Sequence, residues 1–469
     1  MSALQEVTVA SFSPERFETL LGDRWEEVDE AIDESRRLLK GRVVWHVNST
    51  ARGGGVAELL QSLLAYARGA GVDVRWMTIS GNPDFFRITK RIHNRLHGAE
   101  GDGLALDDGA RAIYEQVLAD NLPELADRVR AEDVVILHDP QTAGMVDALR
   151  ATGAAVIWRC HVGLDQPNDL AREAWAFLRP YLEDANAYVF SRESFAWEGL
   201  DRDRIAVIAP TIDPFSPKNQ ELGRDTVRAV LQATGIVAGD QPESVTFERQ
   251  DGSRGRVERR AQLTQDVALT LETPLVIQVS RWDALKDPLG VIQGFAEHVA
   301  ADTGAHLLYA GPDVEAVADD PEGAGILREA RELRERLPEE ARSRVHLATL
   351  PMDDPEENAI MVNAIQRHAT VVVQKSLAEG FCLTVSEAMW KARPVVASRI
   401  GGIQDQVEHG VSGLLVDDPH DLAAYGAAVT ELLSDPGRAD RMGAQARERV
   451  RRRFLSNRSL LDYLELVPV

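Results

Sequence analysis

Residues 43–79 read VVWHVNSTARGGGVAELLQSLLAYARGAGVDVRWMTI, and this stretch decides the fold. Its β-branched start at 43–47 predicts a buried strand, and the apolar run at 72–79 predicts another. Between the two, apolar residues recur at helical spacing from Val56 to Ala67. A strand, a glycine-rich loop, a helix and a second strand form the βαβ unit of a parallel sheet.

The same alternation continues along most of the chain. Residues 209–218 (APTIDPFSPK) hold three prolines and no hydrophobic periodicity, which predicts a linker between two domains. The polar stretch 239–260 predicts an exposed hairpin or loop. A chain of 469 residues favours two domains, because single cores stop growing near about 250–300 residues. Further strands are expected at 134–138, 156–159, 188–190, 205–208, 275–279, 306–310, 345–348, 371–374 and 394–397.

These elements predict an α/β protein with two doubly wound, Rossmann-like domains that face each other across a cleft. We expect the first domain over residues 1–212 and the second over 213–451. A C-terminal helix near 452–469 is expected to pack back onto the first domain. Ligands of such folds bind at the carboxyl ends of the strands, so polar residues directly after strands are the candidate site residues.

Composition and net charge argue against several kinds of binding partner and cellular location. The formal net charge of −23 disfavours a nucleic-acid or anionic-membrane surface, which would repel an acidic protein. Two cysteines, Cys160 and Cys382, are too few for a disulfide framework. The N-terminal stretch does not resemble a signal peptide, and no stretch is apolar for long enough to span a bilayer. We therefore expect a cytoplasmic protein that acts on small molecules.

A glycine-rich loop, NSTARGGG at 48–55, lies between the first expected strand and its helix. Glycines let the backbone approach a ligand closely, and the free N–H groups of a helix start favour anions or hydroxyl oxygens. The loop is neither a P-loop nor G-x-G-x-x-G, which disfavours a simple nucleotide triphosphatase or a nicotinamide-dependent dehydrogenase. A tight turn without a ligand remains the alternative for this loop alone.

Arg281 and Lys286 follow the strand expected at 275–279. A guanidinium binds phosphate through two parallel hydrogen bonds, and an ammonium adds a compact charge. Together they could neutralise a leaving diphosphate without a metal. The alternative is a surface ion pair with Asp283 or Asp287.

The block EGFCLTVSE at 379–387 follows the strand expected at 371–374. Glu379 is expected in the mouth of the cleft and Glu387 on the helix that follows. Carboxylates suit sugar and ribose hydroxyls, because each oxygen accepts charge-assisted hydrogen bonds. The alternative is that Glu379 caps the helix and Glu387 is a solvated helical residue.

The glycine-rich loop, Arg281 with Lys286, and the block at 379–387 occur in this order and are followed by Gly401-Gly402-Ile403. This ordered set resembles the retaining glycosyltransferases of GT-B fold. More narrowly, the chain resembles the trehalose glycosyltransferring synthases over about residues 40–455. Cys382 departs from that pattern, since many relatives carry glycine there. The resemblance rests on HVNSTARGGGVAELL (46–60), WRCHVGLD (158–165), AWAFLRPYL (174–182), QKSLAEGF (374–381) and EAMWKARPVVA (387–397).

The resemblance implies transfer of an α-glucosyl group from a nucleoside-diphosphate glucose to glucose, which forms trehalose. It implies catalytic roles for His161, Arg281, Lys286 and Glu379, with Arg281 and Lys286 on the donor diphosphate and Glu379 on the hexose. Donor contacts are further implied for Gly54, Gly55, Gly380, Phe381, Leu383, Thr384 and, at the ribose, Glu387. Acceptor contacts are implied for Asn48, Ser49, Arg159, Asp165 and Gly402. We expect no required metal or other cofactor, and a homodimer is compatible with the resemblance.

Two alternative functions stay open. A trehalose phosphorylase would use glucose 1-phosphate with the same phosphate-binding residues, and Glu387 would then have no ribose to bind. A non-catalytic protein that binds a sugar nucleotide is the alternative from another class. A nucleotide-sugar 2-epimerase is disfavoured, because the histidine-rich pattern of its cleft is not evident in this chain.

Overall fold

The computed structural model describes residues 4–51, 54–240, 242, 244–314, 322–464 and 466. The chain divides into two compact units, which we call unit 1 (Met1–Thr211 with Ser456–Val469) and unit 2 (Ile212–Leu455). Within the described residues, each unit contains one seven-stranded sheet, and a separate two-stranded hairpin lies in unit 2. The prediction of two doubly wound α/β domains is confirmed.

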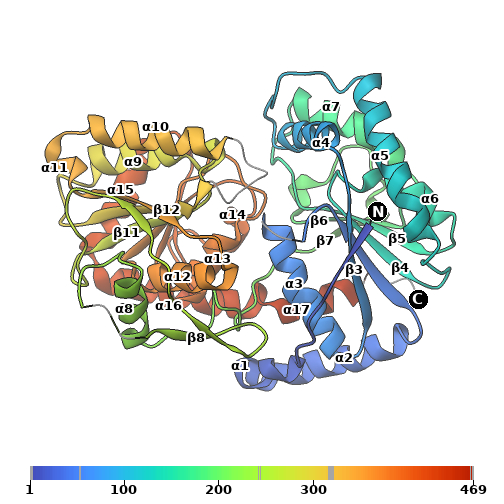
Figure 1. The fold of residues 1–469 in the computed structure, drawn as a ribbon, viewed down its shortest axis with the longest axis horizontal. Coiled ribbons are helices and arrows are strands. Elements are labelled where there is room, and N and C mark those ends of the chain that lie inside the picture. Colours follow the sequence, from blue (N-terminus) through green and yellow to red (C-terminus); the bar gives the residue numbers. More distant parts are fainter. Residues whose placement is uncertain are drawn as a thin grey trace. The chain divides into compact units, whose positions relative to one another are not determined.

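The sheet of unit 1 has the strand order β1-β3-β2-β4-β5-β6-β7. Only β1 runs antiparallel to its neighbour within this described sheet. The strands are β1 (Leu4–Val7), β2 (Val43–Asn48), β3 (Asp73–Ile79), β4 (Val134–His138), β5 (Ala155–Cys160), β6 (Ala187–Phe190) and β7 (Ile205–Val207). One face carries α3 (Gly54–Gly69) and α17 (Ser456–Leu464), with α2 (Trp25–Leu38) packed on α17. The other carries α4 (Pro83–Leu96), α5 (Asp108–Ala126), α6 (Val146–Arg150) and α7 (Asp169–Leu178) (Figure 1).

The sheet of unit 2 has the order β10-β13-β12-β11-β14-β15-β16, with β10 antiparallel to β13 at one edge. The strands are β10 (Gln262–Thr264), β11 (Leu275–Val279), β12 (His306–Pro312), β13 (Val345–Leu350), β14 (Val371–Gln374), β15 (Val395–Ser398) and β16 (Leu414–Val416). Helices α9 (Pro288–His298), α10 (Gly323–Arg336) and α15 (Leu422–Ser434) cover one face. Helices α8 (Arg224–Ala233), α12 (Pro355–His368) and α13 (Leu383–Trp390) cover the other. The remaining helices are α1 (Glu18–Leu21), α11 (Glu339–Arg342), α14 (Ile403–Gln406) and α16 (Pro436–Arg453).

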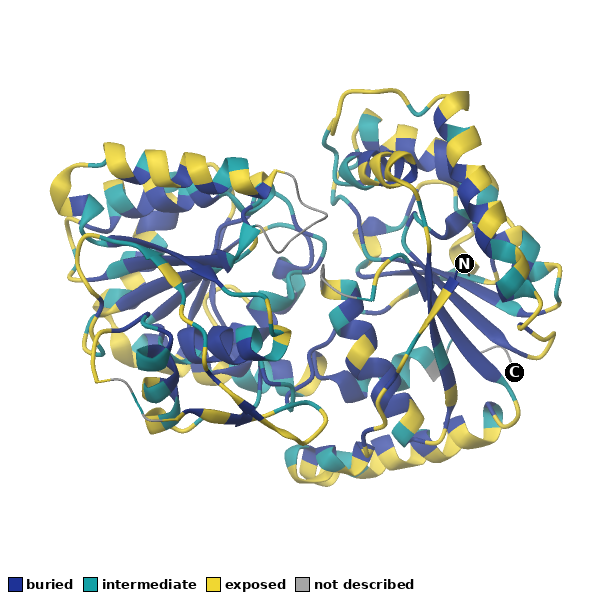
Figure 2. Ribbon diagram, in the orientation of Figure 1, coloured by how far each residue is buried: buried dark blue, intermediate teal, exposed yellow. Residues whose placement is uncertain are grey.

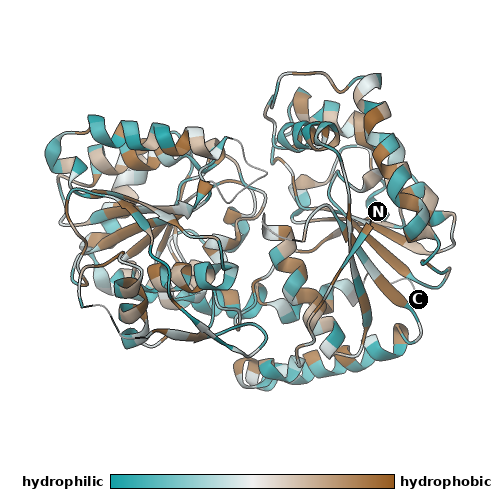
Figure 3. Cartoon of the chain, viewed as in Figure 1, coloured by the Kyte–Doolittle hydropathy of each residue, from teal (hydrophilic) through white to brown (hydrophobic). Residues whose placement is uncertain are grey.

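The central strands of both sheets are buried on both faces. Strand β2 is buried at every residue, and so are β4, β14 and β15. Figure 2 shows the central strands dark blue and much of the outer sides of the helices yellow, and Figure 3 shows most of these strands brown. Continuous apolar strands are expected where helices cover a parallel sheet on both sides.

The predicted strands at 134–138, 275–279 and 371–374 are found with the same bounds, and the others differ by one or two residues. The structure adds β1, β10 and β16, which the sequence analysis did not predict. The polar stretch 239–260 does contain a hairpin, formed by β8 (Thr246–Glu248) and β9 (Arg254–Arg256). As predicted, the hairpin is mostly exposed, and within its two strands only Phe247 and Gly255 are buried.

The chain crosses from unit 1 to unit 2 inside the predicted linker. The division falls between Thr211 and Ile212, and Ile212 forms a parallel bridge with Leu455 at the end of unit 2. Helix α16 belongs to unit 2, whereas α17 belongs to unit 1, where it contacts α2 and α3. Among the described residues, no helix combines the length and hydropathy that a membrane span requires.

Candidate functional site

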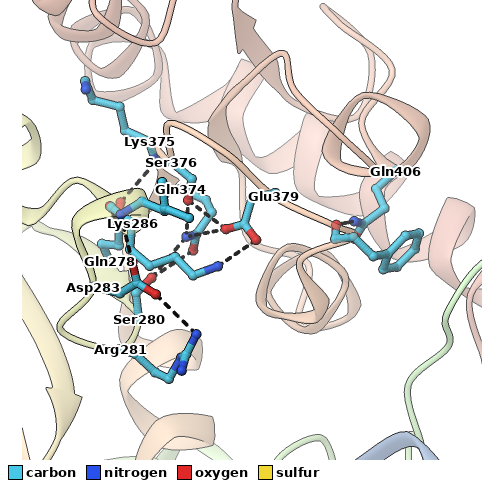
Figure 4. A network of polar contacts seen from close by, with 12 residues as sticks. Gln278, Ser280, Arg281, Asp283, Lys286, Gln374, Lys375, Ser376, Glu379 and Gln406 are labelled. Atoms are coloured by element: carbon cyan, nitrogen blue, oxygen red, sulfur yellow. Dashed lines mark hydrogen bonds and ion pairs between the residues drawn. The ribbon is translucent and has the colours of Figure 1, made fainter. Parts of the chain in front are cut away.

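A lysine and a glutamate meet at the carboxyl ends of β11 and β14. Lys286 lies in a short turn after β11, and Glu379 lies in the loop after β14. The Lys286 Nζ donates a hydrogen bond to the Glu379 Oε2 at 2.6 Å (Figure 4), and the Glu379 side chain is only 4% exposed. Burial disfavours the Lys286 ammonium, but the Glu379 carboxylate outweighs burial and raises the pKa of Lys286 above its ordinary value. The two groups therefore form an ion pair.

The second carboxylate oxygen of Glu379 is held by residues that the sequence analysis did not single out. Ser376 Oγ donates to Glu379 Oε1 at 2.7 Å, and Gln374 Nε2 donates to Ser376 Oγ at 2.9 Å. Gln374 Nε2 also donates to Ser280 Oγ at 3.0 Å, which connects the ends of β14 and β11. Their position in the sequence could have identified them as site residues, because Gln374 ends a predicted strand and Ser376 follows it. The network fixes the direction in which Glu379 points.

A second ion pair holds the turn that carries Lys286. Lys375 is 1% exposed, and its Nζ pairs with the carboxylate of Asp287. Asp287 has a left-handed backbone (φ 51°), and its Oδ1 caps α9 by accepting from Gly290 N at 3.0 Å. Gln278 connects the two loops, since its Nε2 donates to Lys286 O at 2.8 Å and its Oε1 accepts from Lys375 N at 3.0 Å. The partner of Asp287 is thus Lys375.

Arg281 differs from Lys286 in its surroundings. Its side chain is 46% exposed, and Nη2 lies 3.2 Å from Asp283 Oδ2. Figure 4 shows Arg281 on the same side of the network as the Lys286 ammonium. An exposed ion pair of this kind contributes little to stability, about 0–1 kcal/mol, so Arg281 can exchange Asp283 for another anion at low cost.

The loop after β14 packs closely against the glycines that precede α14. Gly402 N donates to Gly380 O at 2.8 Å. A Cβ at Gly401, which has φ +45°, would lie 2.0 Å from Glu379 O, and one at Gly402 would lie 2.5 Å from the Phe381 ring. Glycine is required at both positions because the two backbones approach so closely. Gly402 therefore supports the loop of Glu379.

Helix α13 begins directly after this loop. Leu383 and Thr384 open the helix and are partly exposed, whereas Glu387 is 3% exposed and lies 3.6 Å from Lys218 Nζ. The residue that precedes the helix is Cys382, and no side chain caps it. The alternative in which Glu379 caps the helix and Glu387 is solvated is therefore wrong.

Replacing Cys382 by glycine is expected to raise the free energy of unfolding by up to about 1 kcal/mol. Cys382 has φ 72°, and a side chain in the left-handed region costs about 1–2 kcal/mol. The greater freedom of glycine in the unfolded chain offsets about 0.5–1 kcal/mol of that gain. Urea denaturation tests this, with Cys382→Ala as the matched control that removes the thiol and keeps the strain. A Gly variant less stable than the Ala variant would contradict the strain argument.

In unit 1, His161 follows β5 and contacts two residues from the end of β4. Its backbone N donates to Asp139 Oδ1 at 2.8 Å, and its Nε2 lies 3.0 Å from His138 Nδ1. His138 Nε2 in turn lies 3.0 Å from His46 Nδ1 in β2. Burial lowers the pKa of all three histidines, that of His46 to about 3, so the imidazoles are uncharged near neutral pH. Sequence reasoning identified His161 but not His46, His138 or Asp139.

The other candidate residues of unit 1 differ in how accessible they are. Arg159 is fully buried, and its Nη2 donates to Ile208 O at 2.7 Å, which favours a supporting role. Asn48 is buried and accepts from Trp76 Nε1 at 2.8 Å, while Ser49 directly after β2 is partly exposed. Asp165 pairs with Arg192 and accepts from Ser194 Oγ at 2.9 Å.

The glycine-rich loop is described in part. Gly54 and Gly55 are the first residues of α3, and Arg52 and Gly53 lie outside the described residues. Among the described residues, no group of three or more His, Cys, Asp and Glu side chains is placed to hold a metal ion. The expectation that no metal is required stays a prediction.

The free energy of unfolding is expected to fall as the pH decreases from about 7 to 5. The folded-state pKa of His46 is about 3, against an ordinary value of 6.5, so below about pH 6.5 the unfolded chain binds a proton that the native state does not. The loss approaches about 1.4 kcal/mol per pH unit for His46 alone. Denaturant titrations test this, with His46→Phe as the variant that lacks this site. A slope equal in wild type and variant would contradict an uncharged His46.

Comparisons with known proteins cover both units. The family model "Trehalose synthase, N-terminal domain" matches residues 46–197, and the model "Glycosyl transferases group 1" matches residues 260–449. The chain is 37% identical over 438 residues to the trehalose synthase of Rubrobacter xylanophilus, which covers 93% of this chain and 92% of that protein. It is 27% identical over 421 residues to the trehalose phosphorylase of Pleurotus sajor-caju, covering 83% of this chain and 53% of that protein.

A solved structure has the same fold. It is described as "Trehalose-6-phosphate from E. coli bound with UDP-2-fluoro glucose", and it matches with a TM-score of 0.67 and 14% identity. The match covers 92% of this chain and 99% of that chain, which shows that the fold is GT-B. Because the identity with a trehalose synthase extends over nearly the whole chain, the protein belongs to the trehalose synthase family of glycosyltransferases.

Proposed function

We propose that the protein transfers an α-glucosyl group from a nucleoside-diphosphate glucose to the anomeric hydroxyl of glucose, which forms trehalose with retention of configuration. The observation that carries this proposal is the ion pair between the partly exposed Lys286 and the buried Glu379, 2.6 Å apart at the ends of β11 and β14. A cation for a phosphate and a carboxylate for sugar hydroxyls stand side by side there. These are the two groups that a sugar diphosphate needs.

Unit 2 would bind the donor. Arg281 and Lys286 would contact the diphosphate, and Glu379 would accept hydrogen bonds from hydroxyls of the hexose. Glu387 on α13 would contact the ribose, and the loop and first turn formed by Gly380, Phe381, Leu383 and Thr384 would surround the phosphates. When the donor binds, Lys286 and Glu379 would each give up their mutual contact and contact the donor instead. Neither charge would then be left buried without a partner.

The proposed reaction needs no protein nucleophile. The bond between the anomeric carbon and the phosphate oxygen breaks, and the acceptor hydroxyl oxygen bonds to the same face of that carbon. A phosphate oxygen of the leaving diphosphate takes the proton of the acceptor hydroxyl. Arg281 and Lys286 stabilise the negative charge that grows on the diphosphate, so their contribution is larger in the transition state than in the ground state.

Unit 1 would supply the acceptor side. His161 would contact the reacting sugar, with Ser49, Asp165 and the start of α3 at Gly54 and Gly55 as further contacts. The buried Asn48 and Arg159 would act by supporting these groups. Gly402 of unit 2, which we expected as an acceptor contact, would act through the loop of Glu379.

A trehalose phosphorylase is the second candidate, because several relatives carry that name. In that reaction glucose 1-phosphate replaces the sugar nucleotide, and the product is inorganic phosphate. The donor-side residues serve either reaction, with one exception. Glu387 would then have no ribose to bind. Its buried position on α13, next to Lys218, would contribute to stability alone.

The proposal is tested by incubating the purified protein with glucose and, separately, UDP-, ADP- or GDP-glucose, or glucose 1-phosphate. We expect trehalose and nucleoside diphosphate to form together from at least one nucleotide donor. Trehalose from glucose 1-phosphate alone would support the phosphorylase. Sugar-nucleotide binding without any disaccharide would support the non-catalytic alternative. Turnover that is strictly lost on chelation would contradict the expectation that no metal is required.

A further inference from the structure

Three histidines from neighbouring strands form a continuous hydrogen-bonded chain in unit 1. His46 lies within β2, His138 ends β4 and His161 follows β5. Both nitrogen–nitrogen distances are 3.0 Å, and the successive rings are stacked with interplanar angles of 22° and 16°. His46 is 3% exposed and His138 is 1% exposed. Apolar side chains would fill these positions at lower cost if packing were their purpose, because a buried polar group is unfavourable unless it is hydrogen-bonded.

The chemistry of imidazole couples the three rings. A neutral imidazole has one N–H and one lone pair, and His138 uses both of its nitrogens within the chain. The N–H groups of the three rings must therefore point in the same direction. Either each ring carries its proton on Nδ1 and His161 offers an Nδ1–H group, or each carries it on Nε2 and His161 offers an Nδ1 lone pair. A change at His161 requires the same change at His138 and His46.

The far end of this histidine chain is closed by the C-terminal helix. The ring of Tyr463 in α17 meets His46 edge-on, with ring centroids 6.3 Å apart. The guanidinium of Arg159 lies 5.9 Å from the centroid of the same Tyr463 ring. Four other ionisable groups among the described residues lie near the histidines: Arg159, Asp139, Cys160 and Tyr463. The positive charge of Arg159 disfavours protonating His138 and His161.

We propose that His138 and His46 are positioning residues, which fix, as one unit, the tautomer that His161 offers to the sugar. This inference rests on the proposed function, in which His161 contacts the reacting sugar. The hydrogen bond that one imidazole nitrogen makes decides whether the other nitrogen carries the proton. Because His138 is itself hydrogen-bonded to His46, it fixes the tautomer of His161 more strictly. His138 acts through His161 and does not touch substrate.

The test is His138→Phe, which keeps an aromatic ring in the stack and removes both hydrogen bonds. We expect kcat for trehalose formation to fall at least about tenfold, with a smaller change in KM for the nucleotide donor. His138→Gln, whose amide can donate and accept, should recover part of the loss. The matched control is His346→Phe in unit 2, because His346 and His306 form a similar stacked pair at 2.8 Å where β12 and β13 begin. The control should leave kcat unchanged.

The second readout is ¹⁵N NMR of the histidine side chains in the substrate-free protein. The inference expects the same tautomer for His46, His138 and His161 in wild type, and a change of the His161 signals in His138→Phe but not in His346→Phe. Different tautomers in wild type, or an unchanged kcat in a folded His138→Phe variant, would overturn it. If His138→Phe does not fold, His46→Phe cuts the chain at its end and is read in the same way. Since the NMR result needs no substrate, a failure of the proposed reaction would be seen separately.

Discussion

Replacing Lys286 by methionine is expected to lower kcat for trehalose formation by about 10²–10³-fold, since one lost transition-state donor costs about 3–4 kcal/mol. Lys286 lies 2.6 Å from Glu379 and carries the compact charge at the ends of β11 and β14. Steady-state kinetics with the nucleotide donor measure the effect. Turnover close to wild type would remove Lys286 from the catalytic residues.

A loss of stability could imitate this result, because Lys286→Met leaves the buried Glu379 carboxylate without its partner. The double variant Lys286→Met/Glu379→Gln removes both charges, and we expect it to recover stability but not turnover. Lys40→Met is the matched control, since Lys40 is exposed in unit 1, and it should change neither quantity. Recovery of turnover in the double variant would show that Lys286 acts only through stability.

Replacing Lys375 by methionine is expected to lower the free energy of unfolding by about 3–5 kcal/mol, which is the usual cost of removing one partner of a buried ion pair. Lys375 is 1% exposed and pairs with Asp287, whose carboxylate caps α9 directly after Lys286. Urea denaturation followed by circular dichroism measures the change.

The double variant Lys375→Met/Asp287→Asn separates the charge from the packing. It leaves no unpaired charge, and the asparagine can still cap α9, so most of the stability should return. A single variant as stable as wild type would show that the pair does not hold the turn. Equal losses in the single and double variants would assign the effect to packing around the lysine stem.

Strands were predicted well where the sequence marks both ends. The strands at 134–138, 275–279 and 371–374 are mostly apolar runs bounded by polar residues or proline, and the structure gives them the same bounds. The unpredicted β1, β10 and β16 have three or four residues, and they become strands only by pairing with distant segments such as Leu4 with Ile79. Local patterns do not contain that information.

The candidate site was likewise predictable only where local sequence identifies its residues. Lys286 and Glu379 were identified because each follows a buried strand, and adjacent parallel strands bring them together. The pairing of Lys375 with Asp287 depends on a left-handed turn, which the sequence of that loop does not specify. The contact between His46 and His138 joins residues 92 positions apart, and it depends on the order and register of β2 and β4. A single sequence predicts that these strands exist but not which side chains meet across them.

The central claim is the transfer of a glucosyl group from a nucleotide donor with retention. It is tested most directly by ¹³C NMR of the disaccharide formed from unlabelled glucose and a nucleoside-diphosphate glucose labelled at the anomeric carbon. The account predicts α,α-trehalose with the label at an α anomeric carbon, together with one equivalent of nucleoside diphosphate. A β-linked product, or trehalose formed without release of nucleoside diphosphate, would contradict it.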